Sequence, residues 1–212
     1  MSEILTTISE RLQKGKAAEV VTLVKEAMEA GLAPKDILDN GLLAGMGIIG
    51  EKFKNNEVFV PEVLVAARAM NKGVEVLKPM LIAEGVTSRG VAVIGTVKGD
   101  LHDIGKNLVK MMMEGRGLKM IDLGVDVPPE KFVEAAKEND ADVICCSALL
   151  TTTMGEMSKV VEMVQQAGLS QKVKVMIGGA PVTQSFCEQI GADCYTPDAT
   201  TAADAALAYC AG

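Results

Sequence analysis

Apolar residues recur every three or four positions along the first 83 residues, which is the period of an amphipathic helix. Ile4, Ile8 and Leu12 form the first such series. The pattern is interrupted where glycine, proline or asparagine occurs, at 14–15, 31–34 and 55–56. This part of the chain is therefore predicted to form four helices.

The pattern changes after a polar, glycine-containing stretch at 84–90. Short β-rich runs now alternate with helical segments. Strands are predicted at 91–96, 119–122, 142–147, 173–177 and 193–195, and helices at 104–115, 129–138, 154–167, 181–190 and 199–209. Such alternation predicts a parallel sheet with helices on both faces. We expect a helical domain at 1–86 and an α/β domain at 87–212.

Composition narrows the class of protein. Aromatic residues make up only 3% of the chain, which argues against recognition of single-stranded nucleic acid by stacking. A net charge of -7 opposes binding to phosphate backbones and to anionic membranes. The first residues lack the basic and apolar regions typical of a signal peptide, and no apolar run of membrane-spanning length is seen in this sequence. We therefore expect a cytoplasmic protein without a nucleic-acid or membrane partner.

The single histidine of the chain, His102, lies between the first predicted strand and the helix after it. A neutral imidazole can bind a metal through one nitrogen, and a carboxylate such as that of Asp100 can hold the N–H of the other. A zinc site built on two or three imidazoles is excluded. A histidine that is merely hydrogen-bonded to Asp100 at a turn also fits this pattern.

Two further predicted strands end in residues that suit a ligand. Ser147 follows the third strand together with the hydroxyls of 151–153, and Gly178-Gly179 follows the fourth. Ligands of parallel sheets bind beyond the carboxyl ends of the strands, and paired glycines let a ligand approach the backbone closely. An ordinary turn would also explain the glycines. Neither a GxGxxG nor a P-loop pattern follows the first strand, so a nucleotide-centred function is disfavoured.

Three of these segments carry a family resemblance. Asp100-Leu101-His102-Asp103-Ile104-Gly105 matches a DxHxxG motif, Ser147-Ala148-Leu149 matches SxL, and Gly178-Gly179 matches GG. The chain thus resembles the corrinoid proteins of cobalamin-dependent methyltransferase systems, of the methanol, methylamine or glycine betaine type. It is also similar to the cobalamin-binding module of methionine synthase. The resemblance implies a four-helix cap followed by a Rossmann-like (flavodoxin-like) parallel-sheet domain that binds cobalamin.

The resemblance also implies how the cofactor is held. Cobalamin or a related corrinoid would bind base-off/His-on, with its lower nucleotide base displaced and the Nε2 atom of His102 as axial ligand to cobalt. Asp100 would accept the Nδ1 proton, and Thr153, where methionine synthase has serine, would extend the hydrogen bonds; these three are the expected catalytic residues. Ser147 and Leu149 would line a tunnel for the displaced base. Further contacts are implied for Leu101, Asp103, Ile104, Gly105, Thr151, Gly178, Gly179, Ala180, Asp198 and Ala199.

The resemblance places the helical cap over the upper face of the corrinoid. Five residues recur at three- and four-residue spacing and are the expected contacts: Phe59, Glu62, Ala66, Ala69 and Met70. An aromatic residue at position 59 would shield the methyl–cobalt bond, and Glu62 replaces a glutamine of methionine synthase. The same spacing fits the core between helices, and for Met70 both interpretations stand.

The implied function is that of a corrinoid methyl carrier. Such a protein accepts a methyl group on Co(I) from a substrate:corrinoid methyltransferase. It delivers the group as methyl-Co(III) to an acceptor methyltransferase that uses tetrahydrofolate or a thiol, and a reductive-activation protein is a further possible partner. Two alternatives are a cobalamin-responsive sensor and the cobalamin subunit of an adenosylcobalamin mutase. The first needs an output module, for which 1–83 leaves no room, and the second lacks the helical cap.

Overall fold

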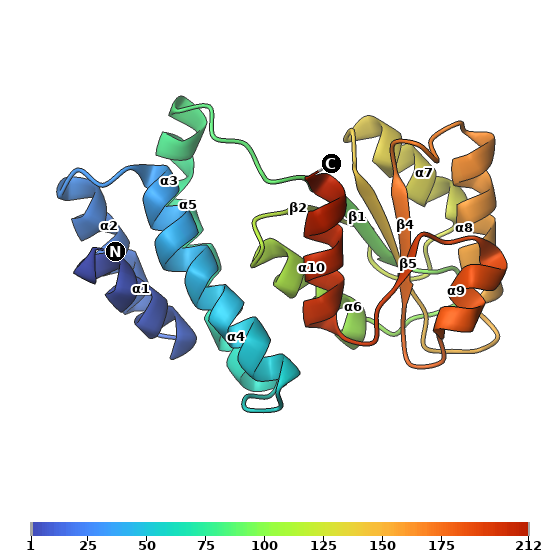
Figure 1. The fold of residues 1–212 in the computed structure, drawn as a ribbon, viewed down its shortest axis with the longest axis horizontal. Coiled ribbons are helices and arrows are strands. Elements are labelled where there is room, and N and C mark those ends of the chain that lie inside the picture. Colours follow the sequence, from blue (N-terminus) through green and yellow to red (C-terminus); the bar gives the residue numbers. More distant parts are fainter. Residues whose placement is uncertain (1, 212) are drawn as a thin grey trace. The chain divides into compact units, whose positions relative to one another are not determined.

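The structure, a computed structural model, describes residues 2–211. It divides into two compact units. One comprises the chain up to Ser88 together with Gly115–Gly117, and the other comprises Arg89–Glu114 and the chain from Leu118 onward. Figure 1 shows the first as helices alone and the second as a sheet with helices. No helix within 2–211 combines the length and the apolar character needed to cross a membrane.

The first unit consists of helical segments separated at the predicted breaks. They are α1 (Glu3–Gln13), α2 (Ala17–Glu29), α3 (Pro34–Asp36), η1 (Ile37–Leu43), α4 (Ala44–Lys54) and α5 (Val60–Ala83). Because α3, the π-helical η1 and α4 follow one another without a gap, they form one continuous rod, and the four predicted helices are confirmed.

Proline and glycine explain where these helices begin and how closely they pack. Pro34 starts α3 and Pro61 lies in the first turn of α5, where a missing backbone N–H costs nothing. On α5, a Cβ atom added at Gly73 would lie 2.8 Å from a methyl of Leu42 and 3.2 Å from one of Val20. The absence of a side chain at Gly73 therefore lets three helical segments meet.

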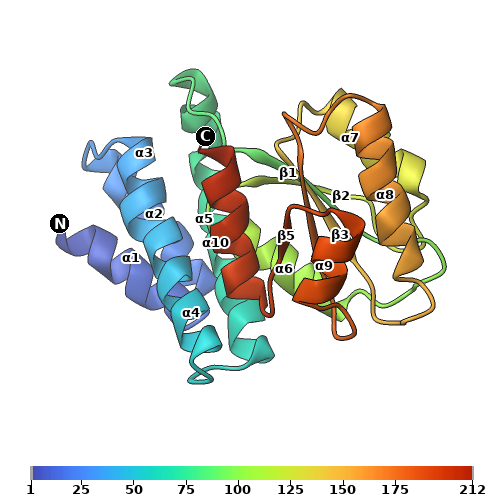
Figure 2. The ribbon, with the colours of Figure 1, turned by 45° about the vertical axis from the view of Figure 1, so that its right-hand side comes forward.

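The second unit is a five-stranded parallel sheet in the order β2-β1-β3-β4-β5. The strands are β1 (Val91–Thr96), β2 (Lys119–Asp122), β3 (Val143–Ser147), β4 (Lys174–Gly178) and β5 (Cys194–Tyr195). The helices are α6 (Ile104–Glu114), α7 (Pro129–Glu138), α8 (Gly155–Gln166), α9 (Gln184–Ile190) and α10 (Ala199–Cys210). Figure 2 shows α6 and α10 on one face of the sheet and α7 and α8 on the other. The predicted fold class is confirmed.

The predicted boundaries of these elements were close, with one larger difference. The helix predicted at 181–190 begins only at Gln184. The residue before it, Thr183, has an extended backbone, and its side chain accepts the N–H of Phe186, so it caps the helix. Pro181 therefore lies in the turn after β4 and not in the first turn of α9.

The register of the sheet aligns the ends of its three central strands. Thr96 at the end of β1 lies opposite Ser147 of β3, and Ser147 lies opposite Gly178 of β4. The strands are apolar on both faces, as expected for a parallel sheet covered by helices. Their carboxyl ends therefore present three consecutive loops at one edge.

An ion pair between a buried lysine and a more exposed aspartate joins α6 to the end of β2. The Nζ atom of Lys106, whose side chain is only 3% exposed, lies 2.7 Å from Oδ1 of Asp122. Lys110 lies 3.1 Å from the other oxygen, and the N–H of Gly124 also donates to Oδ1. Burial opposes ionisation of Asp122, but these donors outweigh it and hold the pKa of the carboxyl below its usual value.

We expect Asp122→Asn to lower the free energy of unfolding at pH 7 by roughly 1–3 kcal/mol, because the Lys106 ammonium loses its charged acceptor. Because the folded pKa is lowered, the stability that ionised Asp122 supplies is present above its unfolded pKa of about 3.9 and is lost as the pH falls further. Urea unfolding across pH should show the difference between the two proteins shrinking below about pH 4.

A matched control is Glu134→Gln, which neutralises an exposed carboxylate paired with Lys131. It should change the free energy of unfolding by less than about 0.5 kcal/mol. A loss for Asp122→Asn that is no larger than this, or that does not depend on pH, would contradict the assignment.

Candidate functional site

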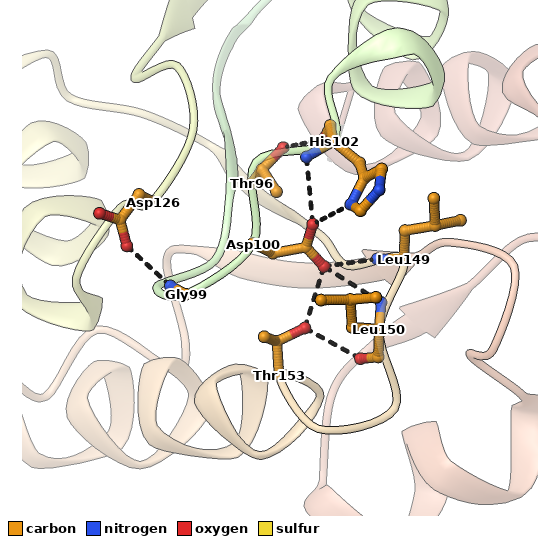
Figure 3. Close-up of polar contacts among 8 residues, drawn as sticks. All are labelled: Thr96, Gly99, Asp100, His102, Asp126, Leu149, Leu150 and Thr153. Atoms are coloured by element: carbon orange, nitrogen blue, oxygen red, sulfur yellow. Dashed lines mark hydrogen bonds and ion pairs between the residues drawn. The ribbon is translucent and has the colours of Figure 1, made fainter.

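The carboxylate of Asp100 lies at the centre of the loops that follow β1 and β3 (Figure 3). Its side chain is completely buried. Oδ1 lies 2.7 Å from Nδ1 of His102 and accepts the backbone N–H of the same residue at 3.1 Å. Because both contacts come from two residues ahead, the loop folds back on itself and fixes the imidazole ring.

The second oxygen of Asp100 is held by the loop after β3. Oδ2 accepts the backbone N–H groups of Leu149 and Leu150, at 2.8 and 3.1 Å. The hydroxyl of Thr153 lies 2.9 Å from the same oxygen and also 2.9 Å from the carbonyl of Leu150. A carboxylate from one loop thus binds the next loop through two amides and a hydroxyl.

These contacts keep the Asp100 carboxylate ionised. Burial opposes ionisation of Asp100, but hydrogen bonds from His102, Leu149 and Leu150 outweigh it and hold the pKa of the carboxyl well below its usual range. An ionised Asp100 accepts the Nδ1 proton, which assigns the lone pair of neutral His102 to Nε2. The side chain is 52% exposed, and within 2–211 no residue bonds to Nε2. The site therefore presents a nitrogen donor to a ligand.

Apolar side chains from the same two loops are left in solvent beside this donor. Leu101 and Ile104 are 71% and 77% exposed, and Leu149 and Leu150 are also exposed. A group of exposed apolar residues around an oriented nitrogen is typical of a site for a large, largely apolar ligand. Asp103 and Gly105 are exposed in the same segment, and the Asp103 carboxylate accepts from Asn107 one turn along α6.

A cavity of about 280 Å³ opens beside this loop, at the carboxyl ends of β3 and β4. Gly105, Ser147, Gly178, Gly179, Ala180 and Asp198 line it, all of them predicted site residues. A Cβ atom at Gly178 would meet no atom within 4 Å, so this glycine leaves room in the cavity. The Ser147 hydroxyl makes no bond to any residue between 2 and 211 and remains available to a ligand.

Gly179 serves a different purpose from its neighbour. Its φ is +132°, which side chains rarely allow, and a Cβ atom there would lie 1.8 Å from the carbonyl oxygen of Ala148. The second glycine therefore lets the loops after β3 and β4 touch.

Among the residues predicted around the displaced base, Leu149 and Ala199 do not line this cavity, and neither does Thr151. The N–H of Leu149 donates to Asp100, and the tunnel role of its side chain stays a prediction. Thr151 is exposed, and Ala199 is buried in the first turn of α10. Asp198 does line the cavity, but its carboxylate caps α10 by accepting the N–H and hydroxyl of Thr201.

The five predicted residues of the cap differ in their surroundings. Phe59 is 63% exposed and immediately precedes α5, so it is not on the helix as its spacing indicated. The carboxylate of Glu62 accepts the N–H of Phe59 and thereby caps α5. Ala66, Ala69 and Met70 are buried, as the helix-core interpretation expects. Their contact with a cofactor stays a prediction.

Sequence reasoning missed much of the cavity wall. Met113, Cys145, Met176 and Tyr195 line it, but their places within helices and strands, and not a motif, bring them there. Burial raises the pKa of the Cys145 thiol to about 12, so it acts as a neutral apolar group. No cluster of three or more histidine, cysteine, aspartate or glutamate side chains within 2–211 could hold a metal ion alone. A metal at His102 would need other ligands, such as those of a macrocycle.

Comparison with known proteins agrees with this site. Residues 90–207 match the family model described as "B12 binding domain", and 4–78 match a second model of the same description. The fold and site therefore define a B12-binding protein.

The relatives define the particular family. The chain is 44% identical to dimethylamine corrinoid protein 1 of Methanosarcina mazei, over 94% of this chain and 93% of that protein. It is 46% identical to trimethylamine corrinoid protein 1 of Methanosarcina acetivorans, over 87% and 85%. A chain of the methanol:cobalamin methyltransferase complex MtaBC from Methanosarcina barkeri matches with a TM-score of 0.89 and 33% identity, over 100% and 81%. The chain belongs to the corrinoid proteins of methyltransferase systems, and the sensor and mutase alternatives are not favoured.

The two adjacent glycines allow a matched test. We expect Gly179→Ala to lower the free energy of unfolding by about 3 kcal/mol or more, because the new methyl group would overlap the Ala148 carbonyl. Gly178→Ala should leave stability unchanged within about 1 kcal/mol but weaken corrinoid binding, because its methyl group points into the cavity. Urea unfolding and corrinoid titration measure both. Equal stability loss in the two variants would contradict the different roles.

Proposed function

We propose that this protein carries a methyl group between two methyltransferases, with a methylated amine as the methyl donor. The curated relatives that match over most of the chain are named for dimethylamine and trimethylamine, and this similarity supports the donor. The acceptor methyltransferase uses tetrahydrofolate or a thiol, and a reductive-activation protein restores the cofactor after oxidation. We assign the helical cap to residues 1–86 and the corrinoid-binding domain to residues 87–212.

When bound, the corrinoid supplies the chemistry: a reduced cobalt that takes up a methyl group and passes it to a second nucleophile. The chain supplies position and charge. Nε2 of His102 would bind the cobalt, because Asp100 orients the ring and no residue within 2–211 bonds to this nitrogen. Asp100 keeps the proton on Nδ1, and Thr153 holds the second oxygen of Asp100. With His102 in this role, the nucleotide base of the corrinoid would be displaced, as in base-off/His-on binding.

Exposed residues around His102 would support the lower face of the macrocycle. Leu101 and Asp103 come from the first loop, Ile104 and Gly105 from the first turn of α6, and Leu149 and Thr151 from the loop after β3. The displaced nucleotide would lie in the cavity, where Gly178 leaves room, Ser147 offers a hydroxyl, and Ala180 and Asp198 line the wall, with Ala199 next to Asp198 in the chain. In the cap, Phe59 would shield the methyl group, as the resemblance implies, and Glu62, Ala66, Ala69 and Met70 are proposed as further contacts.

One observation carries this proposal: the chain's single imidazole is oriented by a buried carboxylate, and its free nitrogen is bordered by exposed apolar side chains. A histidine that only stabilised a turn would not require this surface.

His102→Ala should therefore abolish the histidine-ligated visible spectrum of the protein after anaerobic loading with methylcobalamin. Added imidazole should restore that spectrum, because it replaces the missing nitrogen donor. Lys98→Ala, at an exposed position of the same loop, should leave it unchanged. An unchanged histidine-ligated spectrum in His102→Ala would refute the axial-ligand assignment.

The donor is tested with the reduced, corrinoid-loaded protein. Methylation should follow addition of dimethylamine or trimethylamine with its own methyltransferase, and should not follow addition of methanol with its methyltransferase. The visible spectrum reports methylation directly. Methylation by the methanol system alone would contradict the amine donor, and methylation by none of these systems would contradict the carrier function.

A further inference from the structure

The loop that carries His102 is held by a residue from outside the loop and its motif. The Oδ1 atom of Asp126, in the segment between β2 and α7, accepts the N–H of Gly99 at 2.7 Å. The backbone N–H of Asp126 donates to the carbonyl of Asp100 at 3.0 Å. Figure 3 shows Asp126 on the opposite side of the loop from the imidazole. Asp126 therefore binds Gly99 and Asp100, the two residues directly before Leu101 and His102.

The backbone of Asp126 is unusual in a way that suits this role. Its φ is +55°, in the left-handed region, which asparagine, aspartate and glycine adopt most readily. This conformation accompanies the simultaneous use of its side chain and its N–H. Gly99, its partner, is also left-handed, with a φ of +82°. The contact therefore joins two turns, each with a residue of positive φ.

Neighbouring bonds keep the two segments together. The N–H of Thr96 donates to the carbonyl of Gly124, and the N–H of Val127 donates to the carbonyl of Thr96. The hydroxyl of Thr96 donates to the carbonyl of His102 at 2.8 Å. The His102 loop is therefore bound at its start through Asp126 and at its end through Thr96.

We infer that Asp126 is a positioning residue for the axial ligand. By holding Gly99 and the backbone of Asp100, it directs the Asp100 carboxylate at Nδ1 of His102, and so aims Nε2. This inference rests on the proposed function, in which Nε2 binds cobalt. Residues that orient a metal ligand typically change metal affinity by roughly 10- to 100-fold when lost, and Asp126 acts one contact further out, so about 3- to 10-fold weaker histidine ligation is expected.

Three substitutions separate the two properties of Asp126. Asp126→Asn keeps both a side-chain oxygen and a tolerance of positive φ. Asp126→Gly keeps the backbone conformation but removes the acceptor. Asp126→Ala removes the acceptor and disfavours the conformation. Asp140 provides the control, because it also has a positive φ, of +52°, but pairs with Lys172 and lies outside the site.

The first measurement uses the protein without corrinoid. Because the chain has a single histidine, its ring signals in a nitrogen-15 NMR spectrum belong to His102 alone. Wild type and Asp126→Asn should show one fixed tautomer with the proton on Nδ1. Asp126→Gly should show a shifted or averaged signal, and Asp126→Ala a larger change. Asp140→Ala should match wild type.

The second measurement uses the protein loaded with methylcobalamin. The fraction with the histidine-ligated spectrum should fall in the order wild type and Asn, then Gly, then Ala. Urea unfolding shows that every sample is folded. Wild-type ring signals and ligation in Asp126→Gly and Asp126→Ala would overturn the inference, as would an equal change in Asp140→Ala. Failure of the proposed function is distinguishable, since an unchanged His102→Ala spectrum refutes it while the corrinoid-free NMR still tests Asp126.

Discussion

The fully buried carboxylate of Asp100 organises the loops at one edge of the sheet. Burying a carboxylate is costly unless several donors replace its water, and Asp100 meets this condition only when the loops after β1 and β3 come together. The parallel register of the two strands supplies that proximity. Folding of the sheet and preparation of the imidazole are therefore one event, because Asp100 is satisfied only in the arrangement that also orients His102.

The helices and strands were predictable because burial of one or both faces of an element produces a recognisable pattern of apolar residues. The Asp100–His102 pair was predictable because the two residues lie only two positions apart in the sequence. The amides of Leu149 and Leu150 were not predictable, since every residue has a backbone N–H. The contact of Asp126 depends on its positive φ angle. Aspartate can adopt this angle, but the presence of an aspartate in a sequence does not predict it. The late start of α9 shows capping by Thr183 prevailing over a proline signal.

The cap shows how one pattern can serve two purposes. Residues spaced along a helix face are recognised as buried, but spacing does not reveal whether protein or cofactor covers them, as for Ala66, Ala69 and Met70. Glu62 is a sharper case, because its carboxylate caps α5 through the N–H of Phe59. A glutamine side chain also carries an oxygen that can accept this bond, so either residue type can cap α5 in this way.

The segment 147–153 touches both halves of the site. Its amides at Leu149 and Leu150 hold Asp100, while the carbonyl of Ala148 presses against Gly179 at the cavity mouth. This short stretch of backbone fixes the distance between the Nε2 atom of His102 and the cavity. A ligand can bind at both places only if the distance between its own two binding groups matches this one. The site therefore selects a cofactor by its length as well as by its chemistry.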